Sequence, residues 1–188
     1  MAKKKKSKST GLIFNVVIIA LAVLTVCTLF MPILKTSVLT LGKELGSVSA
    51  TGADVFTGAF ASEASTELSD GANMIYGLRT GDENTFVAVV MIWSYILTVL
   101  VALGTLVFAV LGMLGMKFRL VNTVLGCALV VLALVAFIFT LVVASKNTAI
   151  ETLADKESGV KVRAMITAYM MFAGLIAGGL QVYKARQK

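Results

Sequence analysis

The side chains of this chain that could do chemistry are mainly carboxylates, and most of them lie in segment 35–85. That segment holds seven of the ten Asp and Glu residues. Five of them gather in its second half: Glu63, Glu67, Asp70, Asp82 and Glu83. Clustered carboxylates can bind Ca²⁺, but residues 70–73 and 81–84 lack the ligand spacing of an EF-hand loop. No pattern pairs two of them for acid–base catalysis either. We therefore expect solvated loop charges and turns here, without a metal site.

Other reactive side chains are scarce. The chain has no histidine, which excludes a Ser-His-Asp or Cys-His nucleophile, a His-ligated zinc and an imidazole pH switch. Cys27 and Cys127 fall in different apolar stretches at different depths, so we predict packed thiols and no disulfide. Met170 and Met171 are typical of core packing. The sequence offers no catalytic, cofactor-binding or metal-ligating residue, and we predict that the protein is not an enzyme and uses no cofactor.

The apolar stretches that must position these residues dominate the composition. Of the 188 residues, 58% are hydrophobic and 14% are charged, whereas about a quarter are charged in ordinary soluble domains. Four stretches contain no charged residue: 12–34, 86–116, 120–145 and 164–183. Each reaches the ~20 residues that span a bilayer as a helix, and none alternates as a barrel strand does. We predict an all-α membrane protein with a four-helix transmembrane bundle.

Charge sorts the connecting segments into two groups. The tails 1–11 and 184–188 and the short turn 117–119 contain ten Lys or Arg residues and no acidic residue. Segments 35–85 and 146–163 contain all ten acidic residues. By the positive-inside rule, both termini are cytoplasmic and the two longer segments are extracellular loops of a multi-pass cell-membrane protein. The lysine-rich tail has no aromatic residue, so we expect no nucleic-acid binding, although such a tail can also hold anionic lipid head groups.

The first apolar stretch also resembles a secretory signal, because lysines precede it. Its 23 residues exceed the apolar core of a signal peptide, which has about 7 to 15 residues. We therefore expect a retained transmembrane anchor.

Small residues on the predicted helices mark faces where two backbones can approach closely. One seam in 86–116 comprises Ser94, Thr98, Ala102, Thr105, Ala109 and Gly112. Gly174 and Gly178 form a GxxxG pair in 164–183. Small side chains favour helix contact in lipid, where hydrophobicity does not distinguish a helix from its solvent. Packing within the bundle explains both candidate interfaces most simply, and self-association or binding of a membrane-protein partner is the alternative.

Segment 35–85 is too long for an ordinary connection and should have a structure of its own. β-Branched residues in 36–41 and alternation in 47–51 predict a small β-hairpin, with a glycine-bounded turn at 42–46. Segment 146–163 is shorter. We expect it to be a turn whose 149–153 part extends the third span or begins a helical cap.

An amphipathic helix is predicted to follow the hairpin. The pattern assigns Asp54 to its N-cap and Gly71 to its end. Apolar residues recur every four positions at Phe56, Phe60, Ala64 and Leu68. Such a helix lies on the bundle or on lipid head groups. Asp54, Phe56 and Phe60 are the candidate residues for an interaction made by this loop.

The predicted layout resembles the claudin-like tetraspan architecture: cytoplasmic termini, four helices, a long first outer loop that begins with a hairpin, a tight inner turn and a short second outer loop. Claudins have a Trp-Leu-Trp group and a cysteine pair in the first outer loop, whereas 35–85 contains neither Trp nor Cys. The resemblance therefore implies the topology and not barrier formation. The sequence TGADVFTG at 51–58 also looks like a stretch in uncharacterised small four-helix membrane proteins of Gram-positive bacteria, which implies no activity.

These patterns favour recognition over chemistry. The leading hypothesis is a non-enzymatic integral membrane protein whose structured outer loop acts in protein–protein interaction or membrane organisation. Its partners would be membrane lipids and a second copy or another membrane protein. The alternative is an accessory subunit of a membrane transporter or export complex, bound through the seam or the glycine pair. The spans contain no charged residue at mid-membrane, which argues against a proton-coupled carrier.

Overall fold

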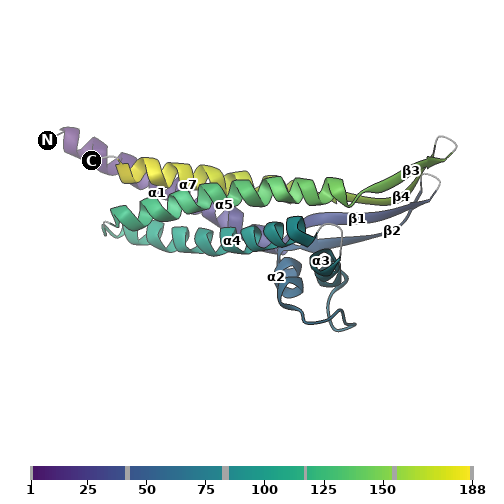
Figure 1. Ribbon diagram of the computed structural model, residues 1–188. Helices are drawn as coiled ribbons and strands as arrows, with labels where there is room; N and C mark the ends of the chain where they lie inside the picture. Colours follow the sequence, from purple (N-terminus) through teal and green to yellow (C-terminus); the bar gives the residue numbers. More distant parts are fainter. Residues whose placement is uncertain (1, 41–42, 82–84, 117, 154–155, 187–188) are drawn as a thin grey trace. The chain divides into compact units, whose positions relative to one another are not determined.

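The computed structural model describes residues 2–40, 43–81, 85–116, 118–153 and 156–186, with the backbone alone for 2–10, 149–153 and 156–158. Its helices are α1 (Ala2–Cys27), the 3-10 turn η1 (Thr28–Phe30), α2 (Gly52–Phe60), α3 (Asp70–Thr80), α4 (Thr85–Met113), α5 (Arg119–Lys146), α6 (Ile166–Tyr169) and α7 (Met171–Arg186). Its strands are β1 (Pro32–Thr40), β2 (Lys43–Thr51), β3 (Ala149–Leu153) and β4 (Lys156–Ala164) (Figure 1).

Among the described residues, four helical segments are long and apolar enough to cross a membrane. They are Gly11–Phe30, Thr85–Met113, Arg119–Lys146 and Ile166–Arg186. The prediction of four long apolar helices is therefore confirmed, with ends that differ by a few residues from the charge-free stretches. α4 ends where the sequence has glycine: Gly115 has a φ of +90°, and the Met116 N–H donates to the Leu111 carbonyl at 3.2 Å. Such a left-handed residue closes a helix C-terminus.

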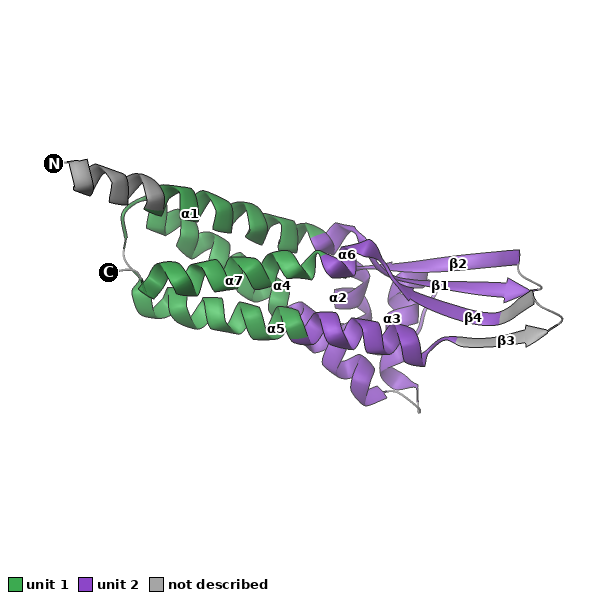
Figure 2. Cartoon of the chain, turned by 90° about the horizontal axis from the view of Figure 1, so that it is seen from above, with its two compact units in different colours: residues 1–27, 97–134, 170–188 green, residues 28–96, 135–169 purple. Residues whose placement is uncertain are grey.

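The described residues form two compact units (Figure 2). Unit 1 is drawn from residues 1–27, 97–134 and 170–188. Unit 2 is drawn from residues 28–96 and 135–169.

Unit 1 is a helical bundle held by close backbone contacts. α1 packs along α7, and one buried cluster of the unit contains Ala102, Leu129 and Ala177. At Gly178 of α7, a Cβ atom would lie 2.5 Å from the Gly126 carbonyl oxygen of α5, and a Cβ at Gly126 would lie 2.7 Å from the Gly178 carbonyl oxygen. Only residues without a side chain allow α5 and α7 to approach this closely.

We predict that Gly178→Ala destabilises the bundle by about 1–3 kcal/mol, because the added methyl group must push two backbones apart. Gly179→Ala is the matched control, since a Cβ at Gly179 meets nothing within 4 Å. It should leave the free energy of unfolding unchanged or raise it by up to about 1 kcal/mol, because alanine is favoured over glycine in a helix interior. Unfolding midpoints in mixed detergent micelles measure both effects. Equal midpoints for the two variants would contradict the close contact of α5 with α7.

Unit 2 is built on an antiparallel sheet that joins the two segments predicted to be outer loops. Within the described residues, the strand order is β2-β1-β4-β3. β1 pairs with β2 from Pro32↔Thr51 to Thr40↔Lys43, and it pairs with β4 on its other side. The β-hairpin prediction is therefore confirmed. The turn expected at 42–46 is wrong in extent, because β2 already begins at Lys43.

The prediction of a turn or helical extension at 149–153 is wrong, because these residues form β3. Thr148 lies between the end of α5 at Lys146 and the start of β3 at Ala149. Its hydroxyl donates to the Ala144 carbonyl (2.8 Å) at the end of the helix. The same hydroxyl oxygen accepts the Val162 N–H (3.0 Å), which fixes the start of the β3–β4 hairpin. The sheet adds the decisive stabilisation, since β4 is paired on both sides.

The single amphipathic helix expected from Asp54 to Gly71 is also wrong. The structure has two helices instead: α2 ends at Phe60, and α3 begins at Asp70. Ala64 and Leu68 therefore lie in the non-helical connection, and Gly71 is in the first turn of α3. The four-residue apolar spacing corresponds to a helix only within α2. A helix as short as nine residues needs tertiary contacts to be stable, and the apolar spacing alone does not extend it beyond Phe60.

Candidate functional site

The carboxylate of Asp54 holds α2, α3 and β2 together. Asp54 is not the N-cap of α2 but its third residue: Thr51 is the N-cap and forms a capping box with Asp54. The Asp54 Oδ2 atom accepts the Thr51 N–H and the Thr51 hydroxyl, both at 2.7 Å. Its Oδ1 atom accepts the hydroxyl of Ser69, which is the N-cap of α3. One side chain thereby links the starts of both helices.

Glycines let α3 pack tightly on this carboxylate. A Cβ at Gly71 would lie 2.6 Å from Asp54 Oδ2 and 2.8 Å from the Ser49 carbonyl oxygen of β2. A Cβ at Gly58 would lie 2.5 Å from the Ala72 carbonyl oxygen. The helices also bury Val55 and Ile75 between them. We call α2, residues 61–69 and α3 the helical clasp.

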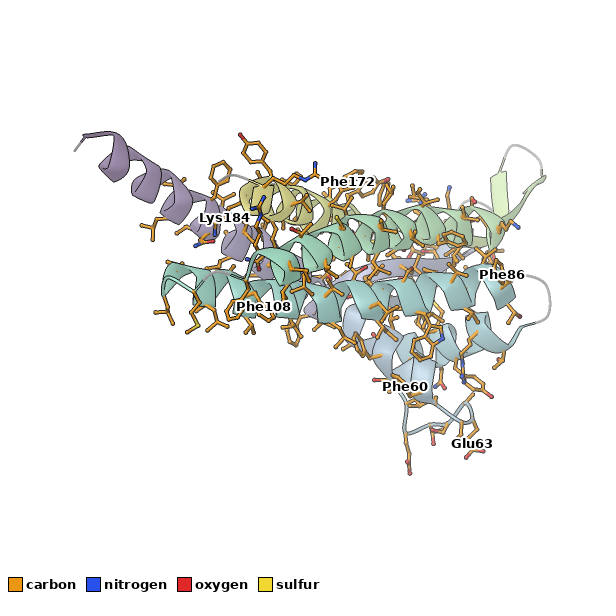
Figure 3. All side chains as sticks on the ribbon, turned by 60° about the vertical axis from the view of Figure 1, so that its left-hand side comes forward. Phe60, Glu63, Phe86, Phe108, Phe172 and Lys184 are labelled. Atoms are coloured by element: carbon orange, nitrogen blue, oxygen red, sulfur yellow. The ribbon has the colours of Figure 1, made fainter. Side chains whose placement is uncertain are left out.

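The connection within the helical clasp is exposed and acidic. We call residues 61–69 the acidic loop, because Glu63 and Glu67 are both exposed there and Asp70, also exposed, follows directly. Figure 3 labels Glu63 on this loop, beyond the end of α2. Its carboxylates therefore face away from the buried contacts of the helical clasp.

Side chains of α3 form hydrogen bonds with the backbone of the acidic loop. Asn73 bonds Ser65 twice: its Oδ1 accepts the Ser65 N–H (3.2 Å), and its Nδ2 donates to the Ser65 carbonyl (2.8 Å). The Arg79 guanidinium donates to the Ala61 carbonyl at 2.6 Å and lies over the Tyr76 ring, 5.3 Å from its centroid. These bonds satisfy loop backbone groups that would otherwise require water. The backbone of the acidic loop is thus held by side chains of α3.

The pKa of Asp54 reflects this arrangement. Partial burial raises the pKa of Asp54, but the hydrogen bonds from Ser69 and Thr51 lower it, and the net value lies below that of an ordinary aspartate. Donors that stabilise the charged form cause this direction. Asp54 is therefore ionised at neutral pH and acts as a structural acceptor.

The other candidate loop residues lie in different environments. Phe56 is half-buried, and its ring meets Tyr95 of α4 edge-on with centroids 6.4 Å apart. Phe60 is 67% exposed. Its ring meets Trp93 of α4 edge-on, with centroids 5.6 Å apart. Of the three predicted residues, only Phe60 offers a large surface to another molecule.

The small-residue candidates are covered by the chain itself. Five seam residues are buried: Ser94, Thr98, Ala102, Thr105 and Ala109. Gly112 is half-buried, and a Cβ there would meet Asn15 Nδ2 at 3.5 Å and Lys184 Nζ at 3.6 Å. Gly174 and Gly178 are buried as well. Packing within the chain accounts for these residues, which have little surface to offer a second molecule.

The open edge of β2 is poorly suited to pairing with another strand. The register shifts between Val38 and Leu39, which leaves Leu45 as an extra residue. Lys43 and Glu44 are exposed beside it. Glu44 forms an ion pair with Lys35, with 2.9 Å between Lys35 Nζ and Glu44 Oε1. Bulges and charges of this kind are what natural sheets use to prevent edge-to-edge association.

Among the described residues, no group of three or more His, Cys, Asp or Glu side chains is placed to hold a metal ion. Cys27 and Cys127 are free thiols. Cys127 is exposed, so the expectation that both cysteines are packed is wrong for Cys127.

Several residues that build the site were missed by the sequence analysis. Thr51 and Asp54 have the three-residue spacing of a capping box, which could have revealed the true start of α2. Ser69 before Asp70 is likewise an N-cap signal for a second helix. Asn73 and Arg79 left no such signal, because they bond backbone carbonyls of residues 8 and 18 positions away.

Comparisons with known proteins return nothing for this chain: no protein-family model, no curated protein and no solved structure matches it. The claudin-like layout and the resemblance at 51–58 stay predictions.

We predict that Asp54→Asn loosens the helical clasp by about 1–2 kcal/mol, because the amide cannot accept hydrogen bonds from Thr51 and Ser69 as the carboxylate does. Asp70→Asn is the matched control, since Asp70 is an exposed residue in the first turn of α3. Hydrogen exchange of the α2 and α3 amides measures the local stability. Equal exchange in the two variants would contradict the role of Asp54.

The same experiment has a pH dependence with a defined sign. The pKa of Asp54 is lower in the folded protein than in the unfolded chain, so its contribution is present above the unfolded value of about 4. It is lost as the pH falls through the lower, folded value. The difference between wild type and Asp54→Asn should therefore shrink on acidification below pH ~4.

Proposed function

We propose that this chain is a multi-pass protein of the cell membrane, without enzymatic activity, that uses the acidic loop to bind a basic surface of a partner protein. The observation that carries the proposal is the set of α3 side-chain bonds that fixes the acidic loop while Glu63 and Glu67 stay exposed. A loop needed only to connect two spans would not require such bonds.

Four long apolar helices support the membrane part of the proposal. In unit 1, Lys184 near the end of α7 donates to Asn15 near the start of the first span, and Gly112 near the end of α4 adjoins both. These helix ends lead into the two tails and the 117–119 turn, which contain only basic charges. The positive-inside rule then favours a cytoplasmic location for both termini.

Orientation is tested by labelling single cysteines in a background in which Cys27 and Cys127 are serine. We expect Thr66→Cys, on the acidic loop, to react with a membrane-impermeant maleimide in intact cells. Arg186→Cys should react only after permeabilisation. The reverse pattern would overturn the orientation, and labelling of both sites in intact cells would overturn the four-span topology.

Preorganisation supports recognition by the acidic loop. A partner that binds an ordered loop does not have to supply the entropy of ordering it. Exposed carboxylates attract basic surfaces and repel each other, so the loop favours a basic partner over the same loop of a second copy. The buried seam and the buried glycine pair give the accessory-subunit alternative no comparable surface.

We predict that a photocrosslinking amino acid at Thr66 captures a defined partner in native membranes. Replacing Glu63 and Glu67 by glutamine should reduce the yield about fivefold, because the loss of charge slows encounter and weakens binding. A crosslinker at exposed Gly77 of α3, where a Cβ meets nothing within 4 Å, is the matched position and should give little product. A product from Thr66 that is insensitive to both substitutions would contradict recognition by charge.

A further inference from the structure

The outward face of α2 carries no charge, unlike the acidic loop that follows it. Its exposed residues are Ala53, Thr57 and Phe60, which follow one another at helical spacing. The Thr57 hydroxyl donates to the Ala53 carbonyl at 3.1 Å, so it requires no bond from a solvent molecule. α2 thus exposes an apolar surface whose polar groups are already satisfied.

Exposed apolar side chains of α4 that belong to unit 2, as α2 does, form one surface with Phe60. They are Phe86 and Trp93, both at least two-fifths exposed and seven residues apart. Such spacing places them on one face of the helix. Trp93, at 44% exposure, is the member that the Phe60 ring contacts. Figure 3 labels Phe60 on α2 and Phe86 near the start of α4.

The position of Trp93 along α4 fits the boundary of a bilayer. About 20 residues of helix cross the hydrocarbon core. Counted back from Met113, where α4 ends, these residues reach Ser94. Trp93 is the next residue, ~1.5 Å beyond that limit. This is where aromatic belts of membrane proteins lie.

Other exposed aromatic residues of unit 2 also stand at ends of the apolar segments. Phe30 is 80% exposed at the end of the first span, and Tyr169 is 49% exposed near the start of the fourth. Tryptophan and tyrosine are enriched at membrane interfaces, because their rings are amphipathic. Phe60 is also an exposed aromatic residue of unit 2, but it lies outside the four apolar segments.

We propose that the Ala53, Thr57 and Phe60 face of α2 lies in the outer-leaflet interface of the bilayer and binds phospholipid there beside Trp93. This inference rests on the proposed four-span membrane function. The bilayer is favoured over a protein as the occupant because Phe60 adjoins the exposed ring of Trp93 and because the face of α2 formed by Ala53, Thr57 and Phe60 carries no charge. The acidic loop, which begins directly after Phe60, then stands at the membrane surface and faces water.

The experiment uses the fact that Trp93 is the only tryptophan of the chain. The full-length protein is placed in phosphatidylcholine nanodiscs whose lipids are brominated either near the head group or near the end of the acyl chain. In the unmodified protein, we expect Trp93 to be quenched about twofold more by the shallow bromines than by the deep ones, and little by aqueous acrylamide.

Phe60 is tested directly in a Trp93→Phe background that carries Phe60→Trp. This tryptophan should show the same shallow quenching and blue-shifted emission. Phe56→Trp in the same background is the matched control, because Phe56 lies on the same helix but packs against Tyr95. It should be quenched weakly by bromine and by acrylamide. Circular dichroism and the melting temperature verify that each variant is folded.

The outcomes separate the two proposals. Leu100→Trp in the same background reports insertion and should be quenched most by the deep bromines. Suppose that the deep bromines quench Leu100→Trp, while Phe60→Trp is quenched by acrylamide or by neither quencher. The proposal that α2 faces lipid is then wrong, and the proposal of membrane-spanning helices is retained. If acrylamide quenches Leu100→Trp, the membrane-spanning function itself fails. Shallow quenching at both Phe60→Trp and native Trp93 supports the inference.

Discussion

An apolar medium such as the hydrocarbon core of a membrane cannot satisfy backbone hydrogen bonds or charges, and the four long apolar helices of this chain meet that constraint. Helices that satisfy their own backbone bonds fill the uncharged stretches, and in lipid the contact between such helices would depend on shape, because burial gives no advantage there. This explains why α5 and α7 meet at Gly126 and Gly178, where neither residue has a side chain to keep the two backbones apart. It also explains why every carboxylate of the chain lies outside those stretches.

Outside the spans, structure depends on directed polar contacts, because the loops contain too few apolar residues for a large core. Asp54 is the clearest example, since its two oxygens accept bonds from Thr51 and Ser69 and so join two helices to a strand. The lowered pKa of Asp54 and the tight approach of Gly71 are two aspects of the same arrangement. The sheet serves a similar purpose, because β1 and β4 bring together segments more than 100 residues apart.

The sequence predicted what depends on local pattern and missed what depends on distant partners. Charge-free runs gave the four long helices, and β-branched residues beside glycine gave the β1–β2 hairpin. β3 was unpredictable because Ala149–Leu153 has no strand signal strong enough without β4 beside it. The helical clasp was misjudged for a related reason: Phe56, Phe60, Ala64 and Leu68 repeat at helical spacing, yet the bonds of Ser65 to Asn73 favour a turn over another helical turn. Asp54 was predicted to be an N-cap and a candidate interaction residue, whereas it is the third residue of α2 and its carboxylate accepts bonds from Thr51 and Ser69.

Two surfaces of opposite character therefore meet at Phe60. The face of α2 that ends there is uncharged and internally satisfied, which suits the low polarity of a bilayer boundary, and the acidic loop that starts there suits water. Because hydrogen bonds of Asp54 and Asn73 link α2, the acidic loop and α3, contact of Phe60 with lipid would set the height and orientation of Glu63 and Glu67 above the membrane. A loop held in this way restricts the geometry in which a partner can approach. A soluble basic peptide and a basic surface anchored in the same membrane would then differ in binding, even with equal charge, because anchoring in the same membrane raises the effective concentration of the second at Glu63 and Glu67.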